Sequence, residues 1–508
     1  MTWRGYSIFG LLLIILGALM LAPATMSYFA GDGAAFGSFA ICAMICVVTG
    51  GLLTLAQYRA KPRSETVAEF GTLLAFYLLA PFLAAAPISI VSPVLSYEAA
   101  YFEMVSTFTT TGATVFDRLD EVRPAIHLWR GLTAWMGGFV ALVMAFALLA
   151  PRNLGGFEVR GDQGRSGAVG RLTGAPEWAG GRGSEASADR IAAAIGMVLP
   201  IYAALTFGLA VVLAALGLAP LNAAVAAMGV LSTSGVKATE ESAFAVGGPA
   251  AEIVVVLFLV LAATRRTYGA AGQGALNWGL MRRDAELRIL LIIALAATTW
   301  LFLRHWIGAL ELDDAGGFSV RALWGAFFTV ISFATTTGYE SAYWSDARAW
   351  SGLDNPSLIL FGLVLIGGGI ATTAGGVKLL RAYALFNHGV REMERLVRPS
   401  SIAGSGARKR GLRREGAQIA WIFVMLYLVA LAAVMLTLSI FGLSFQEALA
   451  ASIAALTNTG PVFTAVTEDG SWLTSLTPEA RAVAAVGMVL GRVELLALIA
   501  MLNPDNWR

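Results

Sequence analysis

The stretch FTTTGATVF, residues 108–116, decides the fold because it sets three consecutive threonines and a glycine inside a very hydrophobic chain. Near-copies recur as LSTSGVKA at 231–238, ATTTGYES at 334–341 and LTNTGPVF at 456–463. These four segments are called the polar stretches below. Their glycines, roughly evenly spread along the chain, are Gly112, Gly235, Gly338 and Gly460. Four copies in one chain indicate an internal fourfold repeat.

The composition indicates a membrane protein. Of the 508 residues, 57% are hydrophobic and only 13% are charged, whereas about 25% are charged in a typical soluble domain. The first apolar stretch is similar to a secretory signal, but it lacks a convincing cleavage site and a second span follows at once, so we expect it to be retained. Ten spans are predicted, at about 7–28, 36–57, 67–88, 128–150, 190–217, 250–264, 287–308, 356–376, 417–442 and 482–502.

The polar connections between these spans alternate in charge. Basic residues concentrate near 59–63, 151–190, 265–283 and 378–414, and the opposite connections are acidic or mixed. Under the positive-inside rule, the basic connections and both termini are expected on the cytoplasmic side of the membrane. This asymmetry accounts for the basic residues without any binding of nucleic acid.

Each polar stretch follows a short amphipathic segment, and a full apolar span comes after it. The segments are SYEAAYFEMVSTF at 96–108, PLNAAVAAMGVL at 220–231, SVRALWGAFFTVISF at 319–333 and SFQEALAASIAAL at 444–456. Each has about a dozen residues, too few to cross a bilayer, so we expect re-entrant half-helices. Ser444 and Glu447 form an S-x-x-E capping pattern, which predicts a helix start in the fourth segment.

The polar stretches carry side chains that are poorly suited to contact lipid. Irregular backbone at membrane depth is tolerated only where it lines an aqueous cavity or is buried in protein. Four such strands around one axis would present rings of carbonyl oxygens, which can replace the water shell of a monovalent cation. A divalent cation would usually require carboxylates, and none stands among the polar residues that lead up to the glycine in any of the four stretches. The polar residues are Thr110, Thr111, Ser232, Thr233, Ser234, Thr336, Thr337, Thr457, Asn458 and Thr459.

Two other interpretations compete with an ion filter. Ser, Thr and Gly are also common at ordinary contacts between membrane helices, but four copies, each between a half-helix and a full span, favour the filter. An intramembrane enzyme would need a nucleophile with a base, or a metal motif such as H-E-x-x-H, and the chain has no H-E-x-x-H motif. We therefore do not expect an enzyme.

These features together resemble the Trk/Ktr/HKT superfamily of potassium transporters, specifically its bacterial TrkH-type branch, over nearly the whole chain. The resemblance implies an all-α integral membrane protein, with two N-terminal transmembrane helices followed by four helix–pore-helix–helix repeats around one pore. The expected segments are a two-span leader at 1–60, pore repeat 1 at 61–150, a cytoplasmic loop at 151–189, pore repeat 2 at 190–285, pore repeat 3 with an intramembrane gating loop at 286–398, a second cytoplasmic loop at 399–416 and pore repeat 4 at 417–508.

In that family each repeat supplies one strand of a selectivity filter, ending in a key glycine. A serine at the first of these glycines goes with sodium preference in the plant branch, and Gly112 here favours potassium. K⁺ is then the transported ion, and no organic cofactor is expected in this chain. The implied K⁺-binding residues are Thr110, Thr111, Gly112, Thr233, Ser234, Gly235, Thr336, Thr337, Gly338, Asn458, Thr459 and Gly460.

The stretch IGGGIATTAGGVKLL, residues 366–380, is poor material for a continuous helix because glycines bracket two threonines. It resembles the family's glycine-rich break in the second helix of the third repeat, which acts as an intramembrane gate below the filter. A glycine-lined packing face is the alternative. The implied gating residues are Gly367, Gly368, Gly369, Thr372, Thr373, Gly375, Gly376 and Lys378.

Arg492, in LGRVELLAL of the last predicted span, is a further gating candidate. A charge at membrane depth costs a few kcal/mol and is functional by default. In the family this Arg faces the pore below the filter, where it would raise the barrier for a cation, partly offset by Glu494 or by the gating loop. The alternative is a structural pair with a buried carboxylate.

The resemblance also implies partners. TrkH-type subunits form homodimers in the bilayer and work with a cytoplasmic, nucleotide-binding regulatory subunit of the TrkA type. No G-x-G-x-x-G pattern after a strand is found here, so nucleotide dependence would come from that partner, which we expect on the basic loops. The leading hypothesis is a potassium-conducting uptake subunit, and the alternative is a K⁺ symporter coupled to H⁺ or Na⁺.

Overall fold

The computed structural model describes residues 7–58, 65–152, 154, 156–157, 187–240, 242–269, 284–307, 315–352, 356–397, 414–464 and 476–495. Within these ranges the regular structure is entirely helical, with no strand. The all-α class expected from the sequence is therefore confirmed. The predicted cytoplasmic loops at 151–189 and 399–416 lie mostly outside the described residues.

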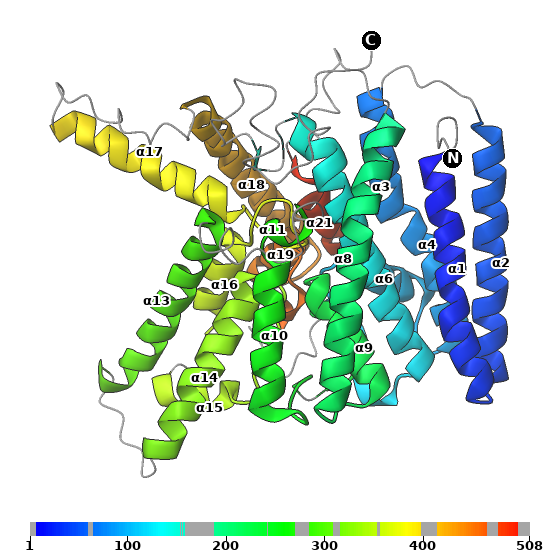
Figure 1. The fold of residues 1–508 in the computed structure, drawn as a ribbon, viewed down its shortest axis with the longest axis horizontal. Coiled ribbons are helices and arrows are strands. Elements are labelled where there is room, and N and C mark those ends of the chain that lie inside the picture. Colours follow the sequence, from blue (N-terminus) through cyan, green and yellow to red (C-terminus); the bar gives the residue numbers. More distant parts are fainter. Residues whose placement is uncertain are drawn as a thin grey trace.

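The first two helices, α1 (Ile8–Phe29) and α2 (Gly33–Ala56), stand side by side at one edge of the molecule (Figure 1). They approach closely because glycines face each other: a Cβ on Gly50 would lie 2.6 Å from the carbonyl oxygen of Gly10. Asp32 caps α2 by accepting from the Ala35 N–H, and this hydrogen bond lowers the pKa of its carboxyl. Small residues at the contact thus hold the leader as a tight hairpin.

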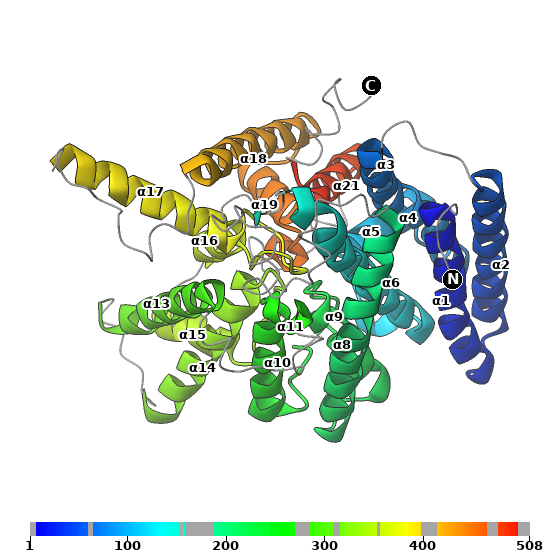
Figure 2. The ribbon, with the colours of Figure 1, turned by 45° about the horizontal axis from the view of Figure 1, so that its top comes forward.

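Most of the remaining helices form four groups with the same plan. A long first helix, a short half-helix and a second helix follow one another in each group, and in chain order the groups surround a common centre (Figure 2). The members are α3 (Glu65–Leu78) with α4 (Ala80–Val91), α5 (Tyr97–Phe108) and α6 (Pro124–Met144); α8 (Ser187–Ala215), α9 (Pro220–Leu231) and α10 (Gly248–Ala262); α13 (Ala285–Ile307), α14 (Ala315–Ala334) and α16 (Ser357–Ile366); and α18 (Arg414–Ile440), α19 (Phe445–Thr457) and α21 (Pro478–Val493).

The half-helices begin and end as the sequence indicates, with one exception. Helices α5, α9 and α19 have 12, 12 and 13 residues. The Ser444–Glu447 capping box at α19 is present with both of its hydrogen bonds. Helix α14 is longer than predicted, with 20 residues, because it begins at Ala315 rather than at Ser319.

Seven helices of the described chain are long and apolar enough to cross a membrane, fewer than the ten spans predicted. The other three predicted spans correspond to α10, α16 and α21, which have 15, 10 and 16 residues. Helix α16 stops at Ile366, where the glycine-rich break begins. The end of the last predicted span, beyond residue 495, lies outside the described residues.

Helix α17 (Leu379–Val397) follows the break and extends outward from the bundle (Figure 1). The centre of the bundle is occupied by the α16–α17 connection and by the ends of the half-helices (Figure 2). All four polar stretches therefore meet in the interior of one chain.

Candidate functional site

The four half-helices end in the same backbone motif. The residue that ends the helical run adopts a left-handed conformation in each: Thr110 (φ 55°), Thr233 (φ 51°), Thr336 (φ 58°) and Asn458 (φ 52°). The next N–H returns to a carbonyl five residues back, as from Thr111 to Ser106 at 2.8 Å and in the three other repeats. This is the Schellman arrangement of a helix C-terminus, in which the left-handed residue is usually a glycine.

Three of these four left-handed residues are threonines, which avoid that conformation. A β-branched residue held there costs of order 1–3 kcal/mol and persists only where its surroundings impose it. The surroundings are dense: Thr110, Thr233, Thr336 and Asn458 are each 1% exposed. The polar stretches are thus strained segments that the bundle holds in place, which is typical of a functional site.

The polar stretches contact one another in a closed ring. A Cβ on Gly112 would strike the Ser234 carbonyl oxygen, and a Cβ on Gly235 would strike that of Thr337. A Cβ on Gly338 would lie 2.6 Å from the Pro461 ring, and the Gly460 N–H donates to the Thr111 carbonyl oxygen. Each stretch therefore abuts the next in chain order, and the fourth abuts the first.

One of the four key glycines, Gly460, has a different backbone conformation from the other three. Gly112, Gly235 and Gly338 adopt positive φ values of 73°, 64° and 79°, as glycine permits. Gly460 does not, because it opens a short 3₁₀ turn, η6 (Gly460–Phe463), in which Pro461 takes the first inner position. The fourth stretch needs its glycine for close approach to the first stretch.

Hydroxyl groups pair within each of the first three polar stretches. Thr109 and Thr111 hydroxyls lie 2.8 Å apart, and the Asn458 amide donates to Thr111 Oγ1 at 3.1 Å. The equivalent hydroxyl pairs Ser232–Ser234 and Thr335–Thr337 are at 2.9 and 3.1 Å. The side chains are thus engaged with one another, which leaves the ring neutral and rich in oxygen.

The break between α16 and α17 lies against one end of the ring. Gly375 N–H donates to Thr336 Oγ1 at 2.8 Å, and a Cβ on Gly375 would strike the Thr457 carbonyl oxygen. The Thr373 hydroxyl accepts from Thr233 Oγ1 at 3.1 Å. The segment 367–378, called the loop below, therefore contacts the second, third and fourth polar stretches, and the predicted interruption of the helix is confirmed.

Arg492 joins the loop to the remaining polar stretch. Its guanidinium donates to the Thr373 carbonyl oxygen at 2.6 Å and to the Thr110 hydroxyl. It lies in the last turn of α21, because α21 ends at Val493 and Glu494 has a φ of 64°. Among the described residues no carboxylate pairs with it, and its Nε has no hydrogen-bond partner.

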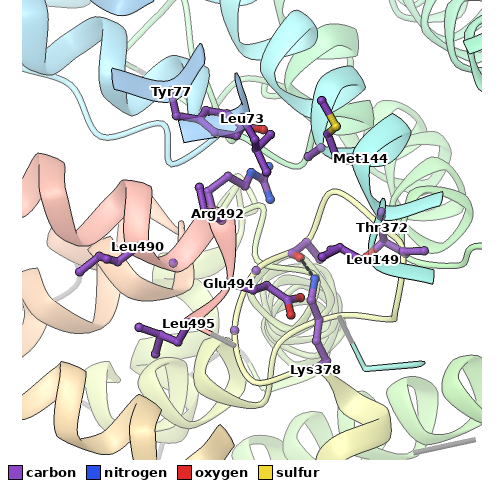
Figure 3. A pocket seen from close by; sticks show the side chains of 18 of the residues that line it. Leu73, Tyr77, Met144, Leu149, Thr372, Lys378, Leu490, Arg492, Glu494 and Leu495 are labelled. Atoms are coloured by element: carbon purple, nitrogen blue, oxygen red, sulfur yellow. Dashed lines mark hydrogen bonds between the residues drawn. The ribbon is translucent and has the colours of Figure 1, made fainter. Parts of the chain in front are cut away.

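A cavity lies beside this contact (Figure 3). Arg492, Glu494 and Lys378 all line it, together with Tyr77 and Leu73 from α3. Glu494 pairs with Arg381 at 3.1 Å, and Lys378 Nζ donates to the Ala374 carbonyl oxygen within the loop. The carboxylate that the sequence offered as a counter-charge for Arg492 is therefore taken by another arginine.

Sequence reasoning missed three buried carboxylates around the ring and the loop. Glu103, Glu252 and Glu286 are 0%, 0% and 2% exposed. Glu286 Oε2 accepts from the loop N–H of Ile370 at 2.8 Å, and Arg265 lies 3.9 Å from its other oxygen. The available signal was the rule that ionisable residues at membrane depth are functional by default, which applies to all three.

The chemistry of the four polar stretches indicates which kind of ion they can bind. Carbonyl and hydroxyl oxygens converge in four copies, and no group of three or more His, Cys, Asp or Glu that could hold a metal occurs within the described chain. A neutral oxygen ring suits a dehydrated monovalent cation. A fixed positive charge and a glycine-rich loop stand at one end of that ring.

Comparisons with known proteins agree with this geometry. A family model described as a cation transport protein, TrkH, matches residues 190–506. The chain is 27% identical to the Trk system potassium uptake protein TrkH of Salmonella typhimurium, over 99% of this chain and 98% of that protein. It is 25% identical to the potassium uptake protein TrkG of Escherichia coli K12, over 98% and 97%.

The same relationship is visible in three dimensions. The crystal structure of the potassium transporter TrkH from Vibrio parahaemolyticus superposes with a TM-score of 0.80 and 25% sequence identity, covering 99% of this chain and 98% of that one. The resemblance carried by the polar stretches is thereby confirmed, because the matched family region covers more than half of the chain and holds three of the four stretches. The chain belongs to the TrkH family of cation transport proteins.

Proposed function

We propose that this protein is the potassium-selective, ion-conducting subunit of a bacterial K⁺ uptake system. The observation that carries the proposal is the closed ring of four polar stretches, each abutting the next through a glycine or its neighbour. The relatives named above are potassium uptake proteins, which supports K⁺ as the ion. We assign no enzymatic activity to the chain.

The ring conducts by replacing the water shell of the ion. Rings of backbone carbonyls bind dehydrated K⁺ in selective channels, and the twelve residues of the expected filter stay as proposed ligands. The membrane potential supplies about 2.3 kcal/mol per charge per 100 mV, so K⁺ can accumulate inside by flow down its electrochemical gradient.

The loop and Arg492 gate this path. Their contacts with Thr233, Thr336 and Thr110 occupy one end of the ring, so an ion can leave only when those hydrogen bonds are exchanged for others. We propose that this arrangement is the closed one. The glycines of the loop and Lys378 then act together, because the loop must shift as a unit for the path to open.

We further propose the setting in which the subunit works. It is a homodimer in the bacterial inner membrane, with both termini and the basic connections in the cytoplasm, as the positive-inside rule predicts. A nucleotide-binding, TrkA-like subunit docks on those connections and biases the loop. "Trk system" in the names of the relatives supports an assembly of several components.

A symporter that couples K⁺ to H⁺ or Na⁺ is the second candidate. The observation that favours it is a set of carboxylates at membrane depth, of which Glu494 lines the cavity beside the loop. The reversal potential of the purified protein in a planar bilayer distinguishes the two. A channel reverses at the K⁺ equilibrium potential, whereas a proton gradient displaces the reversal potential of a coupled carrier.

The filter assignment predicts that Gly112→Ser lowers the K⁺/Na⁺ permeability ratio. The new Cβ strikes the Ser234 carbonyl oxygen and the residue must hold a φ of 73°, so one of four strands shifts. A strained contact of about 1.4 kcal/mol corresponds to a tenfold change, and we expect at least about that effect in bi-ionic reversal potentials and in K⁺-limited growth.

The control for this variant is Gly71→Ser in α3, where an added Cβ meets nothing within 4 Å. It should leave both the ratio and the growth unchanged. An unchanged permeability ratio in folded Gly112→Ser protein would remove Gly112 from the filter.

A further inference from the structure

In the polar stretches, the segments just past the glycines leave the ring without helical hydrogen bonds, and side chains hold them. In the first repeat, Val115 N–H donates to Glu103 Oε2 at 2.8 Å. In the third repeat, Ser341 N–H donates to Thr329 Oγ1 at 3.2 Å. Glu103 and Thr329 stand at the same position relative to their glycines, so the half-helix supplies an equivalent acceptor in both repeats.

Glu252 adds a second support to the third repeat from another element. It lies in the first turns of α10, in the second repeat, and is 0% exposed. One carboxylate oxygen accepts from Ala342 N–H at 2.7 Å and the other from Trp324 Nε1 at 2.6 Å. The Ser341 hydroxyl lies within 2.9 Å of both oxygens.

Glu103 is part of a similar bridge between the first and second repeats. Its other oxygen accepts from Arg130 Nε at 2.6 Å, with both side chains 1% exposed or less. Arg130 in turn donates to the Lys237 carbonyl oxygen at 2.9 Å, just past the glycine of the second polar stretch. The second and fourth repeats have Ala226 and Ala451 at the position of Glu103, and neither can accept a hydrogen bond.

We propose that Glu103 and Glu252 are positioning residues for ion selection, which fix the outer ends of the filter strands without touching the ion. The proposal rests on the filter function proposed above. A charged acceptor makes the shorter and stronger kind of hydrogen bond, and it has no competing water in a dry interior. A ring of carbonyls discriminates between ions only as long as its strands stay in place, and these carboxylates restrain three of the four.

Glu252→Gln tests this because it changes charge and hydrogen bonding but hardly any volume. Its amide presents one oxygen and one NH₂ where two acceptors stood, so the NH₂ must face either the Ala342 N–H or the Trp324 N–H. We expect the K⁺/Na⁺ permeability ratio, taken from bi-ionic reversal potentials of purified protein in a bilayer, to fall about tenfold, as for loss of a charge-assisted hydrogen bond.

A second variant distinguishes positioning from general destabilisation. In Glu252→Gln combined with Trp324→Phe, the NH₂ can face the phenyl ring while the amide oxygen accepts from Ala342, so we expect the ratio to recover. The matched control is Glu69→Gln, which alters a buried carboxylate whose ion-pair partners, Arg152 at 2.5 Å and Arg190 at 3.1 Å, lie outside the polar stretches. Its ratio should stay that of the parent protein.

The results of these variants distinguish a failure of the positioning role from a failure of the filter function. A normal ratio in folded Glu252→Gln, with a lowered ratio in Gly112→Ser, overturns the positioning role and leaves the filter standing. Normal ratios in both variants overturn the filter itself. An equal fall in Glu69→Gln also overturns the positioning role, because the effect would then come from any lost buried charge. Should Glu252→Gln not fold, Ser341→Ala removes a donor to the same carboxylate, and an unchanged ratio in that variant overturns the proposal.

Discussion

Arg492→Ala should raise the K⁺ flux per folded molecule by about ten- to a hundredfold. At 4 Å two positive charges repel with about 4 kcal/mol at an effective dielectric of 20, and we expect part of that barrier to be cancelled already. The guanidinium contacts both the loop and the first polar stretch. Its removal therefore eliminates a positive charge and also the hydrogen bonds that join these two segments. Flux into proteoliposomes with and without the proposed regulatory partner measures the change, and the dependence on that partner should weaken.

Two measurements check the interpretation of this variant. Arg492→Lys keeps the charge and should keep most of the barrier, which makes it the matched control. If Arg492 were half of a buried ion pair, truncation would instead cost about 3–5 kcal/mol of stability. The contacts argue otherwise, since Glu494 is paired with Arg381. Normal flux together with a large loss of thermal stability would leave Arg492 with a structural role only.

Gly375→Ala should open the path by displacing the loop. The added Cβ strikes the Thr457 carbonyl oxygen and comes within 2.8 Å of its carbon. Overpacking of a filled site costs about 1–3 kcal/mol, which corresponds to a shift of about 5–150-fold in the ratio of open to closed molecules. Single-channel recording should show a higher open probability with an unchanged K⁺/Na⁺ permeability ratio.

Gly362→Ala is the control, because Gly362 lies in α16 shortly before the loop and a Cβ there meets nothing within 4 Å. It should behave like the parent protein. Should Gly375→Ala change the permeability ratio but not the open probability, the loop belongs to the filter and not to the gate.

Repetition made much of this fold predictable. The four polar stretches and their half-helices carry local signals, such as the Ser444–Glu447 capping box, and the structure has each of them. The break after Ile366 was equally visible, because glycines on both sides of Thr372 and Thr373 weaken a helix. Span lengths were less predictable: α10 and α21 are shorter than a bilayer crossing, and apolar composition alone does not mark where such helices stop.

The rest of the site depends on tertiary contacts that no local pattern encodes. Threonine disfavours the left-handed conformation, so nothing in the sequence announced it at Thr110, Thr233 and Thr336. Glu252 lies within a predicted span, which marks it as a candidate functional residue, but only the approach of Ala342 from another repeat shows what its carboxylate binds. The partners of Arg492 likewise come from segments far away in the chain.

The closed ring also has a consequence for how the protein is made. Its last seam joins segments from opposite ends of the chain: Asn458 and Thr111 are 347 positions apart, and Arg481 meets Glu98 across 383. Contacts of such separation form late, because the entropy of closing the chain is lost before they form. The first three repeats therefore emerge from the ribosome with one side of the ring unpartnered, and they complete a pore only when the fourth arrives. A chain truncated before the fourth repeat is accordingly expected to leave the ring open and to lack a complete pore.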